Sequence, residues 1–159
     1  MNSEPNELQA TSVALLSLGT LLTRGFDPHE DQWVTDVPLL ATALDGINFD
    51  ASAWAAEYHR VFIREVHPYG NVFFSSNAQM GGAWTHWIHE QLMRLGLHIQ
   101  SHSVEPDHFG HLIITLGHLV GAEQDAVEDG VGGAISGLQS LQAQWIDGTL
   151  TPWMHLLYL

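Results

Sequence analysis

Residues 105–120 read EPDHFGHLIITLGHLV, and the apolar side chains of this segment recur at intervals of three and four residues. This spacing is typical of a helix that buries one face. Pro106 suits the first turn of a helix, because the N–H that proline lacks would have no helical partner there. We therefore predict a helix that opens at Glu105 and Pro106. Its buried stripe comprises Phe109, Leu112, Ile113, Leu116, Leu119 and Val120.

Helical spacing continues on both sides of this segment, with turn-forming residues between the helices. Residues 67–77 differ, because they mix aromatic residues with turn formers, and we predict an ordered loop there rather than a lone strand. The other expected helices cover residues 8–22, 34–44, 50–62, 82–95, 135–146 and 151–159, with a linker at 128–133 and a break at Asp147 and Gly148. The sequence thus predicts an all-α, single-domain helical bundle over residues 1–159, with about six to seven helices and one long aromatic loop.

The charge of the chain is strongly negative. Eighteen acidic residues stand against four arginines and no lysine, which gives a formal net charge of −14. Nucleic-acid binding requires clustered cations, so that class of function is excluded. An anionic membrane surface is disfavoured for the same reason. A basic peptide is the partner that such a field attracts, although the acidity can equally serve solubility alone.

Two further features bear on the location of the protein. The chain has no cysteine, which excludes disulfides and cysteine-based metal sites and fits a reducing compartment. Residues 1–7 are acidic and lack the apolar core of a secretory signal. The best apolar run, residues 13–22, is too short to span a bilayer. We expect a soluble cytoplasmic protein that does not insert into a membrane.

Eleven histidines raise the alternative of a helical metal-binding enzyme. Glu105 and His108 form Glu-x-x-His, the unit of di-iron bundles, but such a site needs a second copy and the chain has none. We therefore predict no metal, no cofactor and no catalytic residue. Three histidine pairs nevertheless have helical spacing, namely His86/His89, His98/His102 and His108/His111. The alternative is a metal-dependent enzyme that uses the first and third of these pairs.

The segment at residues 105–108 places two carboxylates and a histidine within one turn. One interpretation is structural, with Glu105 as the helix cap and Asp107 interacting with the helix dipole. Another is functional, with these oxygens accepting hydrogen bonds from a guanidinium group of a bound peptide, and with His108 titrating near neutral pH. A scaffold subunit without a peptide groove is a further alternative.

Four segments of the chain resemble, in order, segments of the TorD/DmsD/NarJ chaperones. Residues 57–62 (EYHRVF) resemble the family's Glu-Tyr-x-Arg-Leu-Phe, and the loop at 67–77 resembles the Pro-Tyr-x-Ser-like stretch that follows it. Residues 105–108 match a compressed form of Glu-Pro-x-Asp-His. Residues 145–153 (WIDGTLTPW) resemble Phe-Leu-x-x-His-Leu-x-x-Trp. The resemblance covers most of the chain from residue 50 onward.

This resemblance implies an all-α bundle of the TorD-like type and a role in the maturation of a molybdopterin-dependent oxidoreductase. The implied partner is the N-terminal segment of the catalytic subunit, often a twin-arginine signal peptide, which family members hold back until the cofactor is inserted. The family's peptide-contact motif falls on Glu105, Asp107 and His108. We expect the same groove to be lined by Tyr69, Asn71, Phe73 and Trp84.

The chain departs from the family pattern at two places. Thr149 stands where the family usually has histidine, so any role of that histidine is lost or moved. The C-terminal helix of the family is expected to be short or absent, because few residues follow Trp153. That would leave apolar surface near Leu156, Leu157 and Leu159, which a second copy could cover in a homodimer.

Overall fold

The computed structural model describes residues 6–25, 27, 29–43, 45, 50–76, 78–98 and 104–157. These residues form helices and no β-strand, so the predicted all-α fold is confirmed. A 3-10 helix (η1, Asp31–Asp36) and two π-helical segments (η2, His59–Glu65; η3, Ile146–Leu150) accompany the α-helices. The α-helices are α1 (Glu7–Arg24), α2 (Pro38–Ala43), α3 (Ala51–Tyr58), α4 (Gly70–Phe74), α5 (Ala83–Arg94), α6 (Phe109–Glu128), α7 (Gly132–Trp145) and α8 (Thr151–Leu157).

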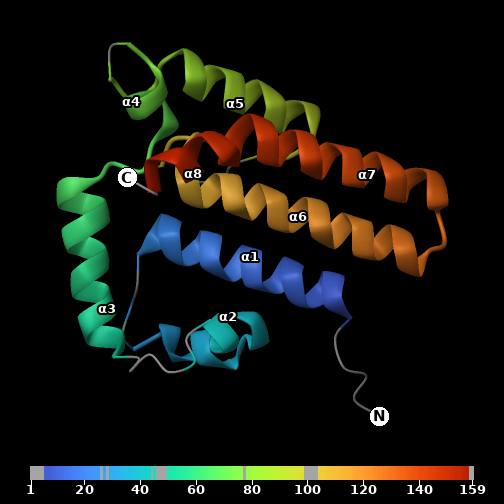
Figure 1. The fold of residues 1–159 in the computed structure, drawn as a ribbon, viewed down its shortest axis with the longest axis horizontal. Helices are drawn as coiled ribbons and strands as arrows, with labels where there is room; N and C mark the ends of the chain where they lie inside the picture. The colour runs from blue at the N-terminus through green and yellow to red at the C-terminus, as the bar shows by residue number, and fades with distance from the viewer. Residues whose placement is uncertain are drawn as a thin grey trace.

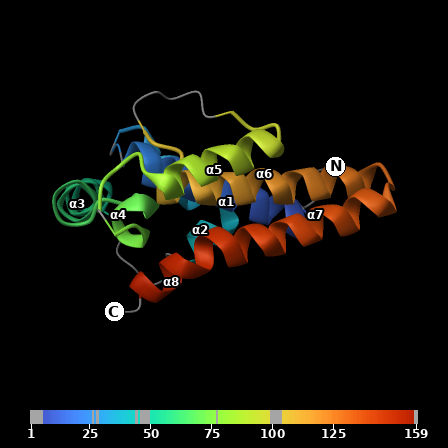
Figure 2. The same ribbon diagram turned by 90° about the horizontal axis from the view of Figure 1, so that it is seen from above.

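The two longest helices, α1 and α6, run side by side through the middle of the molecule (Figures 1 and 2). Glycines allow their backbones to come very close. A Cβ atom on Gly19 would lie 2.7 Å from the carbonyl oxygen of Gly110, which is too close for any side chain. Further along, the Ser12 hydroxyl donates a hydrogen bond of 2.9 Å to the carbonyl of Gly117. The pair is therefore joined by backbone contact as well as by side-chain packing.

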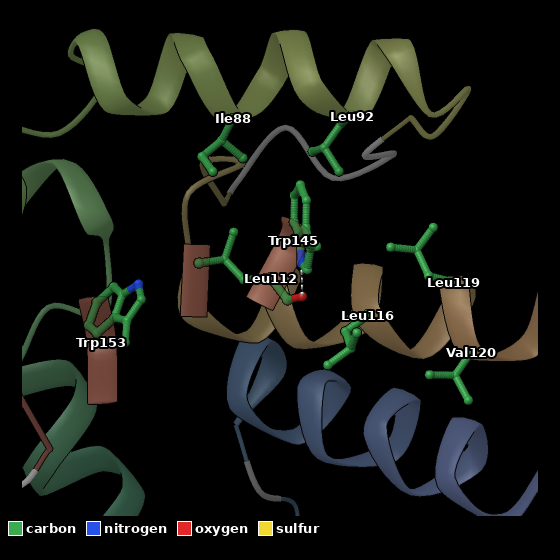
Figure 3. Packing of buried hydrophobic residues seen from close by; sticks show 8 residues of the cluster. All are labelled: Ile88, Leu92, Leu112, Leu116, Leu119, Val120, Trp145 and Trp153. Atoms are coloured by element: carbon green, nitrogen blue, oxygen red, sulfur yellow. Dashed lines mark hydrogen bonds between the residues drawn. The ribbon is translucent and has the colours of Figure 1, made fainter. Parts of the chain in front are cut away.

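The hydrophobic core surrounds α6, with side chains from α5 and α7 on one side and leucines of α1 packed against it on another (Figure 3). Ile88 and Leu92 on α5 point toward Leu112 on α6, and the indole of Trp145 from α7 fills the space between the two helices. The Trp145 Nε1–H donates a hydrogen bond of 2.9 Å to the carbonyl of Leu112, so this large buried ring leaves no unpaired donor. The predicted stripe of α6 is buried, except that Phe109 is only partly covered.

Two of the predicted helices differ in the structure, one in its start and one in its continuity. Helix α6 begins at Phe109 rather than at Glu105 and Pro106, because His108 is the N-cap and its Nδ1 accepts the Gly110 N–H at 3.1 Å. The segment predicted as one helix over 34–44 is divided into η1 and α2. The division falls at Val37, which is extended because a residue before proline is driven out of the helical region.

The predicted break at Asp147 and Gly148 is also wrong. Helix α7 continues through the π-helical η3 into α8, and Thr151 has helical dihedral angles (φ −55°, ψ −42°) instead of capping a new helix. The wider π turn gives room before Pro152, whose ring would otherwise meet the preceding turn. Thr149 is buried, and its hydroxyl donates a 2.6 Å hydrogen bond to the carbonyl of Trp145.

The predicted aromatic loop, dimer contact and absence of a membrane span can be compared with the structure in turn. The expected loop at 67–77 contains α4, so Val72 and Phe73 belong to a helix. The dimer contact expected at Leu156, Leu157 and Leu159 depends on side chains outside the described residues. Within the part of the chain that the structure describes, no helix is both long enough and apolar enough to cross a bilayer.

Candidate functional site

The candidate site is built where the short helix α4 meets the start of α6. The residues just before these two helices form a single antiparallel β-bridge between Tyr69 and His108. Next to it, the Phe109 N–H donates a hydrogen bond of 2.8 Å to the carbonyl of Pro68. The edge of one ring faces the other in the Tyr69–His108 pair, with centroids 5.0 Å apart. Residues that are far apart in sequence are thereby fixed side by side.

Asp107 provides the first hydrogen bonds of α4. Its backbone carbonyl accepts the Gly70 N–H at 3.0 Å, and its Oδ2 accepts the Asn71 N–H at 2.7 Å. The N-cap residue of α4, Tyr69, makes no side-chain cap of its own. A helix of five residues is far below the length that is stable in isolation. The start of α4 therefore depends on Asp107, a residue of another segment.

Asn71 continues the connection from α4 to α5. This fully buried side chain accepts the Trp84 N–H at 3.0 Å, and its Nδ2 donates to the Ser75 hydroxyl at 3.1 Å and to the carbonyl of Gln79. A Cβ on Gly82 would overlap the Asn71 amide, so only glycine fits before α5. One asparagine thus holds both ends of the turn between α4 and α5.

An aromatic cluster is the third component of the site. We define it as six rings joined by centroid distances of 5.1 to 5.6 Å, namely Phe73, Phe74, Trp84, Trp87, Phe109 and Trp153. Trp153 on α8 is buried at its centre, in contact with both phenylalanines of α4. Figures 1 and 2 show α4, α8 and the start of α5 gathered at one end of the molecule.

Part of this cluster is open to solvent. Phe73 is 40% exposed and Trp87 is 38% exposed. Trp87 lies over η3, where a Cβ on Gly148 would be 3.6 Å from its ring. Two further apolar side chains are exposed on the helical segments that follow α7. Ile146 in η3 is 40% exposed, and Met154 in α8 is 45% exposed. We call these four side chains the exposed apolar surface.

The electrostatics of the site come from one buried carboxylate, that of Asp107, and from two buried histidines. Burial, together with the neighbouring His111 ring, lowers the pKa of His108 to about 4, so its imidazole is neutral at pH 7. A neutral Nδ1 is what the cap of α6 requires, and titration of His108 near neutral pH, as expected from the sequence, does not occur. Burial also raises the pKa of the Tyr69 hydroxyl, with further contributions from Asp107 and Glu105.

The structure brings the seven predicted site residues into one region but gives them different exposure. Asp107 and Asn71 are fully buried and His108 is nearly so. Phe73 is exposed. The remaining three are partly exposed, namely Tyr69, Trp84 and Glu105. The Glu105 carbonyl lies 3.1 Å from His111 Nδ1, and its carboxylate lies beside Gly81. Of the two carboxylates, only Glu105 is within reach of a partner in this conformation.

Sequence reasoning missed Trp87 and Trp153 as members of the site. Trp87 follows Trp84 at the helical spacing of three, and that repeat could have identified a shared face. Trp153 was quoted only as part of a motif near the C-terminus. Its role depends on the continuous path of α7 into α8, which the expected break at Gly148 concealed.

The histidine pairs lie in unlike surroundings. His86 is on the surface of α5, where its Nε2 is 3.6 Å from Glu90. His108 and His111 are buried, and the Nδ1 atom of each already has a backbone partner. His102 lies outside the described residues. Among the residues that the structure does describe, no three His, Cys, Asp or Glu side chains come close enough to hold a metal ion.

The chain was compared with protein families, curated proteins and solved structures. A family model described as "Nitrate reductase delta subunit" matches residues 27–158 of the chain. No curated protein and no solved structure matches it. The matched range contains α2 to α8 and every residue of the candidate site.

Proposed function

The chain belongs to the nitrate reductase delta subunit family, whose members are chaperones of molybdoenzyme maturation, and from this premise we propose which part of a client it binds. The ligand is the N-terminal segment, or twin-arginine signal peptide, of the catalytic subunit of a molybdopterin-dependent oxidoreductase. Residues 1–159 act as one cytoplasmic chaperone domain that holds this segment until the cofactor is inserted, before export. The chaperone itself catalyses no reaction.

The exposed apolar surface is the observation that supports this proposal most strongly. A signal peptide presents an apolar stretch, and a helix or extended segment of that kind binds to a surface of aromatic and aliphatic side chains. Phe73 and Trp87 can each bury a large area at small entropic cost, which makes them suitable anchors. Methionine adapts to differing partners, which suits Met154 for contact with a peptide.

The charge of the chain supports a basic ligand. Two of the four arginines already pair with carboxylates of the chain. Arg24 contacts Asp31 at 2.5 Å, and Arg60 contacts Glu65 at 2.7 Å as well as Glu57. A surface dominated by uncompensated carboxylates attracts cationic segments over a distance. Glu105, whose carboxylate lies beside Gly81, can accept two hydrogen bonds from one guanidinium group.

Calorimetric titration with a paired-arginine peptide tests the proposal. We expect micromolar affinity for the wild type and weaker binding at high salt, because screening weakens attraction between exposed charges. Phe73→Ala and Trp87→Ala should each reduce affinity about tenfold or more, the range of an interface anchor. Trp54→Ala on α3 is the matched control, because Trp54 is 39% exposed and lies outside the proposed surface. Equal losses for all three variants would refute the proposed binding surface.

A further inference from the structure

We infer that the two carboxylates at residues 105–108 have different roles: Glu105 meets the bound peptide, whereas Asp107 is a positioning residue that holds α4 in place by accepting hydrogen bonds. This inference rests on the proposed function for the role of Glu105. The role of Asp107 is a property of the fold and can be tested without a ligand. It also replaces the expectation that both side chains contact a guanidinium group.

Burial separates the two carboxylates. Asp107 is fully buried, with Oδ2 bound to the Asn71 N–H at 2.7 Å and Oδ1 without a hydrogen-bond partner among the described residues. Because this side chain is fully buried, a guanidinium group could reach it only if the residues packed around it moved. Glu105 is partly exposed and lies at the edge of that turn, beside Gly81. A peptide therefore meets Glu105 first and can bind it without disturbing the fold.

The hydrogen bonds of Asp107 coincide with the unpaired donors of α4. The first N–H groups of any helix lack partners within the helix and are satisfied by a capping side chain or by water. In α4 these donors belong to Gly70 and Asn71, and Asp107 accepts both, one with its carbonyl and one with its carboxylate. Asp107 is thus the N-terminal cap of α4, provided from a segment 36 residues away in sequence.

Helix α4 connects the capping residue Asp107 to the exposed apolar surface. Phe73 lies on α4 and packs edge-on against Trp153 at 5.3 Å, while Phe74 packs against Trp84 at 5.2 Å. Asn71 continues the same connection to the backbone of Trp84 at 3.0 Å. Loss of the cap therefore displaces Phe73 and loosens the ring contacts that position Trp84 and Trp87.

An acceptor role and a charge role predict different behaviour of asparagine at position 107. Asparagine keeps one oxygen that can accept the Asn71 N–H but carries no charge. If Asp107 acts as a cap, Asp107→Asn restores most of what Asp107→Ala loses. If Asp107 instead binds a cationic group, the two variants lose affinity alike, because both remove the charge.

The test combines peptide titration at two salt concentrations with hydrogen exchange of the free protein. We expect Asp107→Ala to weaken binding about fivefold or more, the change in equilibrium that accompanies loss of a helix cap. The amides of residues 70–75 should exchange faster in that variant, and Asp107→Asn should restore both properties to within about twofold. Glu105→Gln should weaken binding and reduce its salt dependence, with the exchange of residues 70–75 unchanged.

Three outcomes decide between the roles. Equal loss of affinity in Asp107→Ala and Asp107→Asn, with normal exchange of residues 70–75 in both, would overturn the positioning role. If the wild type binds no peptide, the proposed function fails, and the exchange data alone then decide the role of Asp107: fast exchange in Asp107→Ala with recovery in Asp107→Asn supports it, and unchanged exchange overturns it. If Asp107→Ala does not fold, Asp107→Asn decides, since retained binding supports the cap and lost binding contradicts it.

Discussion

Helix α6 meets the rest of the molecule in two different ways. Along its length it packs against α1 through facing glycines, and against α5 and α7 through a continuous aliphatic core. At its N-terminal end it is joined to α4 by hydrogen bonds centred on Asp107 and Asn71, and by the rings of the aromatic cluster around Trp153. The first region is held by many contacts that support one another. The second combines ring contacts with single hydrogen bonds to a short helix, and it is also the region that carries the exposed apolar surface.

This difference indicates a division between scaffold and binding region. Dense packing resists local opening, because any displacement breaks many contacts at once. A short helix held by a few hydrogen bonds can open at lower cost, and binding surfaces are often found in such parts of a fold.

Gly110→Val should lower the free energy of unfolding by about 3 kcal/mol, at the upper end of the cost of overpacking a core. A Cβ at this position would lie 2.7 Å from the carbonyl of Gly19, which is backbone and cannot rotate away. Urea denaturation followed by circular dichroism measures the effect. A change below about 1 kcal/mol would show that α1 and α6 can separate more easily than the described packing allows.

Acidification should weaken the polar junction. The pKa of His108 is about 4 in the folded protein, against 6.5 for a free histidine. The unfolded chain therefore binds the proton more readily, so the stability from His108 is complete above pH 6.5 and is lost as the pH falls toward 4. We expect the free energy of unfolding to fall by about 2 kcal/mol between pH 6.5 and pH 4. Each unit of pKa difference corresponds to about 1.36 kcal/mol, and relaxation of the folded protein around the charged ring reduces the full value.

His108→Asn is the control for that prediction. Asparagine is a good N-cap but does not titrate, so the variant keeps a cap on α6 and removes one proton-binding group. Unfolding free energies at pH 7, 6, 5 and 4 should fall less steeply in His108→Asn than in the wild type. Parallel curves for the two proteins would show that His108 does not contribute to the pH dependence.

Asn71→Ala should lower stability by about 1–2 kcal/mol, the cost of leaving a buried backbone donor without its acceptor. The unpaired group is the Trp84 N–H, so amide exchange at the start of α5 should accelerate while the amides of α1 stay protected. Ser76→Ala, at an exposed neighbouring position, serves as the control. Equal acceleration in α1 and α5 would mean that the two regions open as one unit.

Gly137→Ala should have the smallest effect and the opposite sign. Gly137 lies on the exposed side of α7, and a Cβ there would have no heavy atom within 4 Å. Alanine should therefore raise the free energy of unfolding by about 0.5–1 kcal/mol through its higher helix propensity. The opposite signs expected for the free energies of unfolding of Gly137→Ala and Gly110→Val distinguish a glycine in open space from one needed for close packing of two helices. Destabilisation by Gly137→Ala would reveal a contact of α7 that the described residues do not include.

The scaffold could be predicted well from the sequence. The apolar spacing of residues 8–22, 82–95 and 109–120 predicted α1, α5 and the buried face of α6. Helix α1 nevertheless buries mainly small residues against α6, while its Val13 and Leu18 are exposed. The helix predicted from residue 50 begins there with Asp50 as its N-cap, and the Asp50 side chain accepts the Ser52 and Ala53 N–H groups. Local signals sufficed wherever the stabilising partners were near in sequence.

The binding region was predicted only in part. The family resemblance predicted that the seven residues of the candidate site line one groove, but it did not predict which of them are buried. Helix α4 was not predicted, because its first N–H groups are bonded by Asp107. Nothing within residues 67–77 indicates a partner so distant in sequence. The start of α6 was misplaced because Pro106 gave a strong local signal, whereas the actual cap is a neutral histidine, an uncommon N-cap residue.

The most direct test of the account is hydrogen exchange of the protein with and without a saturating N-terminal peptide of a molybdoenzyme catalytic subunit. We predict slower exchange in α4, at the start of α5 and in η3 and α8, with no change in α1 or the middle of α6. Protection confined to α1, α2 or the outer side of α7, or no protection despite measured binding, would contradict the claim that the aromatic end of the molecule holds the client.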